Sequence, residues 1–332
     1  MPVEYVDITS AEDAGQRIDN FLMRSLKGLP RQRVYKILRS GEVRVNGGRI
    51  KPSHRLQLGD RIRIPPVTLK AEQPIKMADA TVASLEAAIL YEDADLIALN
   101  KPSGFAVHGG SSITSGVIEL FRAFRQAPRL ELAHRIDRDT SGCLLLCKRR
   151  SVLTEVQAAF RHRLVKKKYD LYVAGAWPKS IRTVSLRLQR YETAWGERRV
   201  RTSSAGQLAR TDFAIVDKKQ QATHLSAALH TGRTHQIRAH AQSQQHPILG
   251  DDKYAQSTAL AAPRLCLHAS RLVIPIGRDR LDFQAPIADD MTSFWKTLDL
   301  TPRLIQAPRL NLSNGRLGGS TKGPPEHSDL KF

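Results

Sequence analysis

A run of charged and polar residues, His134–Gly142, leads directly into the apolar segment Cys143–Cys147. The run holds one histidine, two arginines and two aspartates within six residues. Such a sequence predicts a charged turn joined to a buried strand, with a carboxylate at the rim of a hydrophobic core. Asp137 and Asp139 then have two interpretations. Either burial and a fixed arginine set the protonation and direction of a functional carboxylate, or both aspartates cap the turn and pair with neighbouring arginines.

Composition predicts a folded protein that binds a polyanion. The chain has 332 residues, a formal charge of +20 and 41% hydrophobic residues, which suits two domains with real cores. The polyanion is nucleic acid or an anionic membrane surface. No segment approaches the roughly 18 apolar residues needed to span a bilayer. The stretch through Asp7 lacks the features of a signal peptide. The three cysteines form no Cys-x-x-Cys, which argues against a zinc ribbon or a disulfide framework, so we expect a reduced, cytoplasmic protein.

Residues 1–65 predict a small basic α/β module. Apolar residues recur at helical spacing from Ile18 to Leu26, and a second helix is expected between Pro30 and Gly41. Alternation at Val43 and Val45 followed by Asn46-Gly47 predicts a hairpin, and further strand positions run to Ile64.

Charge in this module is one-sided. The stretch from Arg24 to Arg63 contains twelve lysines and arginines but only two acidic residues, Glu42 and Asp60. The cations of the second predicted helix must occupy its exposed side, and we expect them to bind an RNA or DNA backbone: Arg31, Arg33, Lys36 and Arg39. Since Phe21 and Tyr35 are the aromatics nearby, contact through phosphate or shape is favoured over base stacking.

The remaining chain predicts an α+β protein with a large, mainly antiparallel β-sheet. Residues 66–85 are polar and aperiodic and are expected to be a linker. Residues 86–300 form the second domain, with strands near 89–91, 96–99, 169–173, 184–188, 211–216, 223–229 and 271–276, and helices at 154–163 and 234–244. Residues 301–332 are rich in Pro, Gly and Ser and are expected to be a disordered basic tail.

Four motifs in order resemble those of the RluA-type pseudouridine synthases. His134–Gly142 resembles the family signature, with Ile136 in place of the usual leucine. Asn100–Gly104 resembles the first motif, and Lys167-Lys168-Tyr169 resembles the Lys-x-Tyr motif. Gly232–Arg238 resembles the third motif. The resemblance covers about residues 85–290, and the N-terminal module separately resembles an RNA-binding module of a ribosomal small-subunit protein.

The resemblance implies the fold and the activity of this family. Stretches 14–22, 41–46 and 107–110 are similar to those of members that isomerise uridines in 23S rRNA. It therefore implies the large-subunit rRNA as partner, free or in assembling ribosomal particles, with no cofactor and no metal. We expect a monomer that binds no membrane. One departure is Gln245, which stands where the family has glycine.

The resemblance also assigns a catalytic set. Asp137 is the catalytic carboxylate, suited to adding to an electrophilic carbon, taking a proton or stabilising positive charge on the sugar. Arg238 is expected to supply the cation that keeps this carboxylate ionised and oriented. Tyr169 is expected to lie against the target base and to serve in proton transfer.

Other residues of these motifs have less specific roles. Arg233 and Lys168 are expected to bind RNA, and Arg135 and Arg138 either bind phosphate or brace the loop. His134 and His235 are expected to be structural hydrogen-bonding residues, like the turn-forming Asp139, Thr140 and Ser141.

Two other functions fit parts of the sequence. A non-catalytic RNA-binding or ribosome-assembly factor explains the composition and the module, but it leaves the set of Asp137, Tyr169 and Arg238 without a role. A metal-dependent phosphodiesterase built on His134, Asp137 and Asp139 would lose activity to a chelator, whereas a synthase would ignore it.

Overall fold

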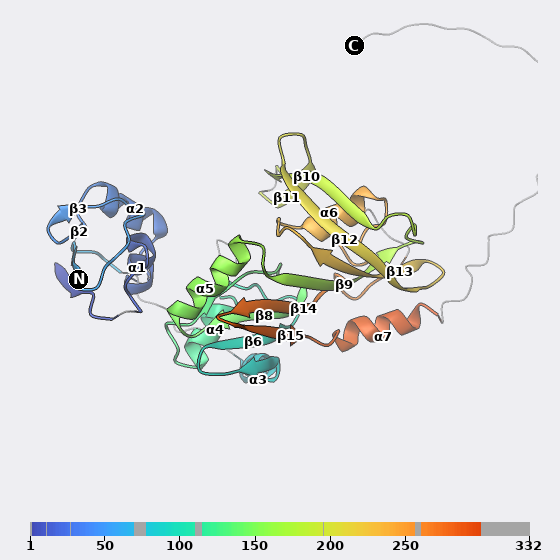
Figure 1. Ribbon diagram of the computed structural model, residues 1–332, viewed down its shortest axis with the longest axis horizontal. Helices are drawn as coiled ribbons and strands as arrows, with labels where there is room; N and C mark the ends of the chain where they lie inside the picture. The colour runs from blue at the N-terminus through green and yellow to red at the C-terminus, as the bar shows by residue number, and fades with distance from the viewer. Residues whose placement is uncertain are drawn as a thin grey trace, which may run out of the picture. The chain divides into compact units, whose positions relative to one another are not determined.

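The computed structural model describes residues 2–10, 12–26, 28–69, 78–109, 115–194, 196–255 and 260–299 (Figure 1). The stretch predicted to be a disordered tail, 301–332, lies outside these residues. Two separate sheets organise the described chain, one in the N-terminal module and one in the second domain.

The N-terminal module pairs two helices with a small sheet. Its four strands have the order β1-β4-β2-β3. The elements are β1 (Glu4–Asp7), α1 (Ile18–Ser25), α2 (Arg31–Arg39), β2 (Arg44–Val45), β3 (Gly48–Arg49) and β4 (Arg61–Ile64). One face of each helix and the inner face of the sheet share a core, which includes Phe21, Ile37 and Ile62.

Local signals in the module act as predicted. Helix α1 begins at Ile18 and α2 follows Pro30, as their apolar spacing indicates. Gly41, just after α2, has φ +75°, and a Cβ there would lie 2.6 Å from Nε of Arg49. Asn46 and Gly47 both have positive φ, 51° and 77°, as a tight hairpin turn of this type requires. Leu58, one of the strand positions expected before Ile64, is not in a strand, since it lies in the turn before β4 and is exposed.

The predicted linker is only partly correct. Val67 is buried in the core of the module, so the module extends past residue 65. Helix α3 (Asp79–Ala87) occupies much of the C-terminal part of the expected linker. Leu85 is its one buried residue, and this single anchor explains why the sequence shows no helical period there.

The second domain is built on a large, mostly antiparallel sheet, which confirms the predicted fold class. In the described chain eleven strands form it, in the order β11-β10-β12-β13-β9-β14-β8-β6-β5, with β15 on β14 and β7 on β8. Among these strands only β14 and β8 pair in parallel. The strands are β5 (Ile89–Glu92), β6 (Leu96–Lys101), β7 (Glu131–Leu132), β8 (Ser141–Cys147), β9 (Lys166–Ala174), β10 (Thr183–Glu192), β11 (Arg198–Thr202), β12 (Gln207–Lys218), β13 (Ala222–Leu229), β14 (Leu267–Ile276) and β15 (Asp279–Gln284).

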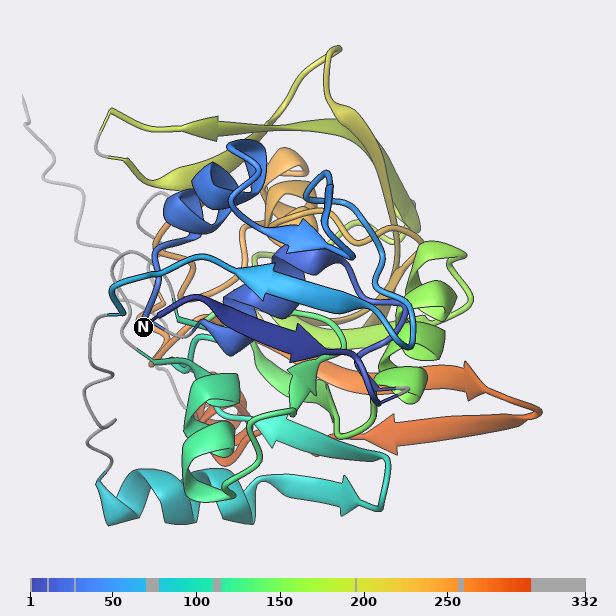
Figure 2. The ribbon, with the colours of Figure 1, turned by 90° about the vertical axis from the view of Figure 1, so that its left-hand side faces the viewer.

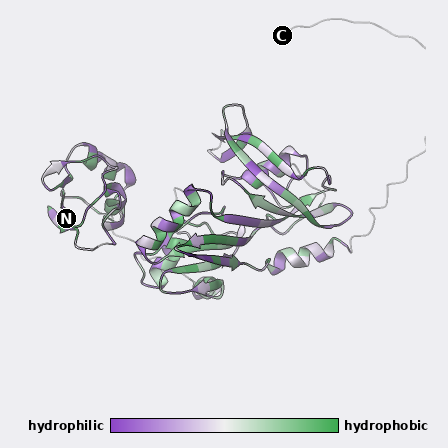
Figure 3. Ribbon diagram, viewed as in Figure 1, coloured by the Kyte–Doolittle hydropathy of each residue, from purple (hydrophilic) through white to green (hydrophobic). Residues whose placement is uncertain are grey.

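Four helices pack on this sheet. Helix α5 (Arg150–Arg161) lies on β8 and β14, and α6 (Gln236–Ser243) contacts β10, β11 and β12 (Figure 1). Helix α4 (Val117–Phe124) shares a core with Leu99 and Leu146, and α7 (Asp289–Thr297) packs Trp295 against Tyr172 of β9. The apolar strands β6 and β8 contrast with the hydrophilic start of β9 (Figure 3).

Several elements of this domain were not predicted. Helices α4 and α7 were not predicted, because the sequence showed convincing helical periodicity only near α5 and α6. Strand β15 was also missed, although it forms a long hairpin with β14 (orange in Figure 2). Phe283 is its one buried residue, and such a short, mostly exposed and charged stretch resembles a polar loop in the sequence.

Candidate active site

A cavity of about 320 Å³ in the second domain collects the predicted catalytic residues. Its walls come from the 133–140 loop, α5, β9, β13 and the start of α6. Asp137, Tyr169 and Arg238 all line it, together with Arg135 and Arg233. Apolar wall residues include Ile136, Phe160, Leu229, Ile237 and Leu267. The cavity therefore combines an apolar lining with a few polar groups, as small-ligand sites do.

The loop that carries Asp137 is held by the Asn100–Gly104 segment. Lys101 is fully buried, and its Nζ donates to the carbonyl oxygens of Pro102, Phe105 and Arg138 at 2.6, 2.9 and 2.9 Å. Burial lowers the pKa of Lys101 to about 7. Ser103 Oγ donates to the carbonyl of Asp139 at 2.6 Å. These bonds fix the backbone on the C-terminal side of Asp137.

Gly142 fixes the same C-terminal side of this loop where it joins the sheet. It is the second residue of the fully buried strand β8, has φ +108°, and a Cβ there would lie 2.3 Å from the carbonyl oxygen of Ala269. Only glycine allows β8 and β14 to approach this closely in this conformation. The Ser141 hydroxyl next to it bonds Nδ1 of His268 at 2.9 Å. Asp137 is thus anchored to the middle of the sheet.

His235 is the cation-forming side chain nearest to the Asp137 carboxylate among the described residues. Its Nε2 lies 3.9 Å from Oδ2 of Asp137, and its Nδ1 lies 2.8 Å from the Tyr254 hydroxyl. Tyr254 in turn accepts the backbone N–H of Val200 at 2.9 Å, which leaves the phenolic proton for Nδ1. Burial lowers the pKa of His235, although the Asp137 charge opposes this. A neutral ring that presents Nε2–H to Asp137 is therefore favoured.

His235 also has an unusual backbone. It immediately precedes α6 with φ 50° and ψ 26°, the left-handed conformation that most residues avoid. Strain of this kind is found where the surrounding structure needs a side chain in one place. The prediction that His235 only fills a structural role thus overlooked its position beside Asp137.

Arg238 is paired with Asp251 rather than directly with Asp137. Its Nε and Nη2 donate to Asp251 at 2.8 and 2.6 Å, and the exposed fractions of the two side chains are 2% and 0%. Burial opposes the charge, but the bonds to Asp251 and the nearby charges of Asp251 and Asp137 raise the pKa of Arg238. The expected direct contact with Asp137 is replaced by a fixed, always charged guanidinium in the same cavity.

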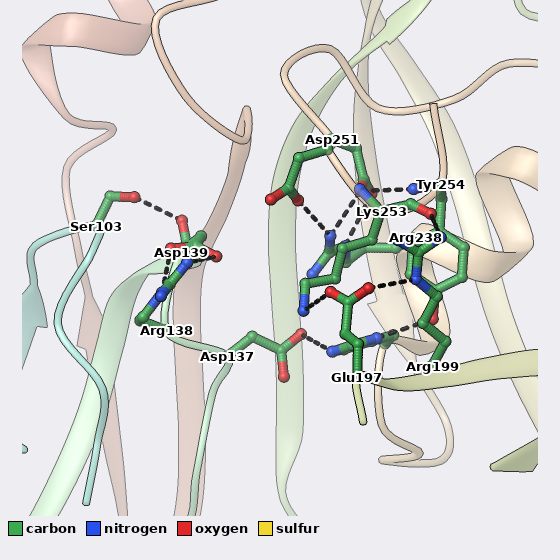
Figure 4. Close-up of polar contacts among 12 residues, drawn as sticks. Ser103, Asp137, Arg138, Asp139, Glu197, Arg199, Arg238, Asp251, Lys253 and Tyr254 are labelled. Carbon is green, nitrogen blue, oxygen red and sulfur yellow. Dashed lines mark hydrogen bonds and ion pairs between the residues drawn. The ribbon is translucent and has the colours of Figure 1, made fainter. Parts of the chain in front are cut away.

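A second layer of contacts holds this arginine pair in place. The carboxylate of Asp251 also accepts the backbone N–H groups of Lys253 and Tyr254 at 3.0 and 3.1 Å. Glu197 bonds Arg199 at 2.7 Å and Lys253 at 2.5 Å, which ties β11 to the 251–254 turn. Figure 4 shows Asp137 facing this cluster. Strand β11 therefore supports the arginine side of the cavity.

Tyr169 lies on β9 and stays protonated. Burial raises the pKa of its phenol, and the negative charge of Asp137 adds to this effect. Lys167, two residues earlier, lies on the same side of β9 and approaches the ring of Phe160, with Nζ 6.0 Å from the ring centre. Burial lowers the pKa of Lys167. The phenol can donate a proton or a hydrogen bond at neutral pH, but it is a poor base there.

His134 has a structural environment. Its Nε2 accepts the backbone N–H of Leu145 on β8 at 3.2 Å, and its ring packs on Phe160. Burial lowers the pKa of His134 to about 4, so the ring is neutral and acts as an acceptor at neutral pH. This agrees with the expectation from sequence.

The cations of the second domain that were expected to bind RNA lie in several different places. Arg135 and Arg233 line the cavity, whereas Arg138 pairs with Asp139 at 2.8 Å on the side of the loop facing Ser103 (Figure 4). The sequence left open whether Arg138 binds phosphate or braces the loop, and this ion pair is the arrangement expected of a bracing residue. Lys168 does not reach the cavity, because alternation along β9 turns it to the opposite face from Lys167 and Tyr169.

The four cations of the module that were predicted to bind nucleic acid all lie on α2. Lys36 and Arg39 line a shallow hollow with Gln32 and Tyr35. Arg31 stacks over the Tyr35 ring, with Cζ 5.6 Å from its centre, and Arg33 is half-buried on the same helix. Tyr35 therefore adds an aromatic surface to a cluster that the sequence suggested was almost purely cationic.

No three His, Cys, Asp or Glu side chains of the described residues gather closely enough to hold a metal ion. Within the same residues no helix has the length and apolar character needed to cross a bilayer.

Three supporting residues were missed from sequence. Lys101 stands inside the Asn100–Gly104 motif, and Asp251 ends the segment His246–Asp251 that follows the third motif, but neither received a role. The sequence did offer a signal for each. Lys101 is a lysine at the end of an otherwise apolar strand, and Asp251 is an aspartate that follows a Leu-Gly turn. Tyr254 gave no signal, because its partners His235 and Val200 are distant in the chain.

Comparisons with known proteins agree with this geometry. Residues 95–243 match the family model of RNA pseudouridylate synthase, and residues 16–62 match the S4 domain. The chain is 46% identical over 300 residues to the ribosomal large subunit pseudouridine synthase C of Haemophilus influenzae, covering 87% of this chain and 93% of that protein. It is 45% identical over 298 residues to the protein of the same name from Vibrio cholerae, covering 86% of this chain and 93% of that protein.

A solved structure supports the same assignment. Human RNA pseudouridylate synthase domain containing 4 superposes with a TM-score of 0.56 at 25% identity, covering 66% of this chain and 95% of the human chain. Together with the curated relatives, this likeness identifies the protein: the chain belongs to the RNA pseudouridylate synthase family and carries an N-terminal S4 domain.

Proposed function

We propose that this protein converts particular uridines of large-subunit ribosomal RNA into pseudouridine, with Asp137 as the catalytic residue. The observation that carries the proposal is the cavity that brings Asp137, Tyr169 and Arg238 together from separate motifs. The relatives at 45–46% identity are named for the large ribosomal subunit, which supports this RNA as the substrate. Action in the cytoplasm, as a monomer, on free rRNA or on assembling particles belongs to the same proposal.

The target uridine has to leave the RNA stack to reach Asp137. Unstacking a base costs a few kcal/mol, and contacts between the flanking backbone and the cationic surface offset this cost. The apolar walls around Phe160 and Ile237 offer the base a dry surface. Excluding water protects the detached sugar from hydrolysis.

The reaction exchanges one bond for another and needs no net oxidation or reduction. The bond from N1 of uracil to C1′ of ribose breaks, a bond from C5 to C1′ forms, the hydrogen leaves C5, and N1 gains one. Asp137 is suited to the steps that develop positive charge at the sugar or require an electron pair, because an ionised carboxylate can stabilise that charge or add to carbon. The Nε2–H of His235, 3.9 Å from Oδ2, helps to orient this carboxylate, and the Arg238–Asp251 pair stands in the same cavity.

Tyr169 is proposed to support the base while it turns. Its half-buried ring on β9 provides a flat face, and its protonated hydroxyl offers a proton donor at neutral pH. Arg135 and Arg233 at the cavity wall are proposed to contact the phosphates next to the target.

The S4 domain is proposed to hold RNA backbone through α2. Arg31, Lys36 and Arg39 are exposed on this helix. Replacing Arg31, Arg33 and Lys36 together by glutamine should weaken RNA binding and lower its salt dependence. Unchanged affinity and an unchanged salt slope would exclude this role for α2.

The decisive assay is tritium release from a large-subunit rRNA transcript labelled at C5 of uridine, with EDTA present. The wild type should release tritium, whereas Asp137→Asn should lose at least a thousandfold in rate while binding RNA normally. Asp139→Asn is the matched control, since its carboxylate pairs with Arg138 and its backbone contact to Ser103 is retained. Activity retained by Asp137→Asn, or lost equally in both variants, would contradict the assignment. Absence of release by the wild type on rRNA, tRNA and immature particles, with tight binding intact, would favour a non-catalytic assembly factor.

A further inference from the structure

The triplet Lys166-Lys167-Lys168 is divided between two hollows by the geometry of its strand. Side chains alternate along β9, so Lys167 lies on the side of Tyr169 and the Asp137 cavity, while Lys166 and Lys168 point to the opposite face. On that face a second hollow of about 320 Å³ opens between β13, β9, β14 and β15. Lys167 is the one residue that borders both hollows.

This second hollow has a small-residue floor and a cationic rim. Ser226 and Ala228 of β13 and the buried Val273 of β14 form the floor, which leaves the space open. Five cations line it: Lys166, Lys167, Lys168, Arg271 and Arg280. Asp282 is the single carboxylate among its lining residues, and it is already paired with Arg271 at 2.8 Å.

Three further cations of the rim form no ion pair in the described chain. Lys166, Lys168 and Arg280 are exposed, and no carboxylate of the described residues lies within ion-pair distance of them. Asp170 interacts with Lys168 only at longer range and already pairs with His224. Like charges gathered around one hollow repel each other, and an anion between them relieves this repulsion. The hollow is thus electrostatically suited to a ligand with several negative charges.

A short exposed turn connects the two hollows. Phe160 closes the Asp137 cavity at the end of α5, and residues 161–164, which follow it, are all exposed and include Arg161 and Arg163. Strand β9 then begins at Lys166 on the rim of the second hollow. A polyanion that leaves the cavity beside Phe160 would therefore meet Arg161 and Arg163 of this turn before Lys166 of the second hollow.

We propose that this hollow, which we call the far-face groove (Lys166, Lys168, Ser226, Ala228, Arg271, Val273, Arg280 and Asp282), binds the ribose-phosphate backbone of the substrate RNA beyond the target uridine. The inference rests on the proposed function, because that function supplies the RNA. It adds a second contact region on the face of the sheet opposite to the catalytic cavity. The groove recognises phosphate charge and so carries no base specificity.

The test compares two variants that each lose three positive charges. The groove variant is Lys166→Gln, Lys168→Gln and Arg280→Gln, which leaves the Arg271–Asp282 pair in place. The control variant is Lys179→Gln, Arg182→Gln and Lys296→Gln, whose exposed cations border neither hollow. Equal thermal unfolding midpoints for both variants and the wild type establish that folding is unaffected.

Binding is measured over a series of KCl concentrations with two RNAs, a long rRNA fragment and a minimal hairpin that holds only the target loop. With the long fragment, the groove variant should lose roughly 10- to 50-fold in affinity, and its plot of log K against log salt should be shallower by about 2. The control variant should change much less. With the hairpin, which is too short to leave the cavity and reach the groove, the groove variant should bind as the wild type does.

Three results would overturn the proposal. These are wild-type affinity and salt slope of the groove variant on the long RNA, an equal loss in the control variant, and an equal loss on the hairpin. If the groove instead serves an acidic protein partner, the first of these results is expected. Tritium release by the wild type is followed in parallel, so that loss of the proposed catalytic function is recognised separately from loss of groove binding.

Discussion

Replacing Asp251 by alanine should destabilise the protein strongly, because it leaves the guanidinium of Arg238 buried without its counter-ion. The exposed fractions of the two side chains are 2% and 0%, so water cannot replace the missing carboxylate without local opening. Removing one partner of a buried ion pair costs about 3–5 kcal/mol. Two backbone N–H groups, of Lys253 and Tyr254, lose their acceptor as well, which places the expected loss toward the upper end of this range.

The neighbouring Asp252 provides a matched control. Its carboxylate lies 3.5 Å from Nη2 of Arg238 but is 71% exposed. An exposed ion pair contributes about 0–1 kcal/mol, so Asp252→Ala should lower the free energy of unfolding by no more than about 1 kcal/mol. Asp251→Asn should fall between the two, because an amide oxygen can still accept a hydrogen bond but carries no charge.

The assay is urea unfolding at neutral pH, followed by fluorescence and extrapolated to zero denaturant. A loss below about 1 kcal/mol for Asp251→Ala, equal to that of Asp252→Ala, would refute the reasoning. It would mean that Arg238 finds another counter-ion in the cavity. The double variant Asp251→Ala/Asp137→Ala would then show a strongly non-additive loss if Asp137 takes that role.

Three further predictions follow from single contacts. Tyr254→Phe removes the hydroxyl that orients His235, so single-turnover isomerisation at saturating RNA should slow by about 10- to 100-fold with unchanged RNA affinity, whereas an unchanged rate would exclude an orienting role toward Asp137. Burial lowers the pKa of His240 to about 4, so the unfolded chain binds more protons between about pH 6.5 and 4, and up to about 3 kcal/mol of stability should be lost as the pH falls through this window. Urea unfolding at several pH values should show a smaller loss in His240→Gln than in the wild type, and the part due to His134, whose pKa is also about 4, should remain. Gln245 has φ +64°, so Gln245→Gly should stabilise the protein by about 0.5–1 kcal/mol, and a lower thermal midpoint would contradict this.

Some of the structural elements behind these predictions could be predicted from the amino-acid sequence, and others could not. The pairing of a charged turn with a buried strand was visible at His134–Cys147, and β8 is buried along its whole length. Helices α1, α2, α5 and α6 and most of the long strands followed from apolar spacing. Short or half-exposed elements such as α3 and β15 could not be predicted in this way, because few of their residues are buried.

The sequence by itself determined the class of the fold and the basic character of the S4 domain, both from local information: residue type, spacing and order along the chain. Its resemblance to a known family is what indicated Asp137, Tyr169 and Arg238. Tertiary structure alone decided that Arg238 pairs with Asp251, that His235 and Tyr254 stand beside Asp137, and that Lys167 and Lys168 face different hollows. These relations join residues from different strands and loops, and only the packing of the sheet fixes which of several available charges meet.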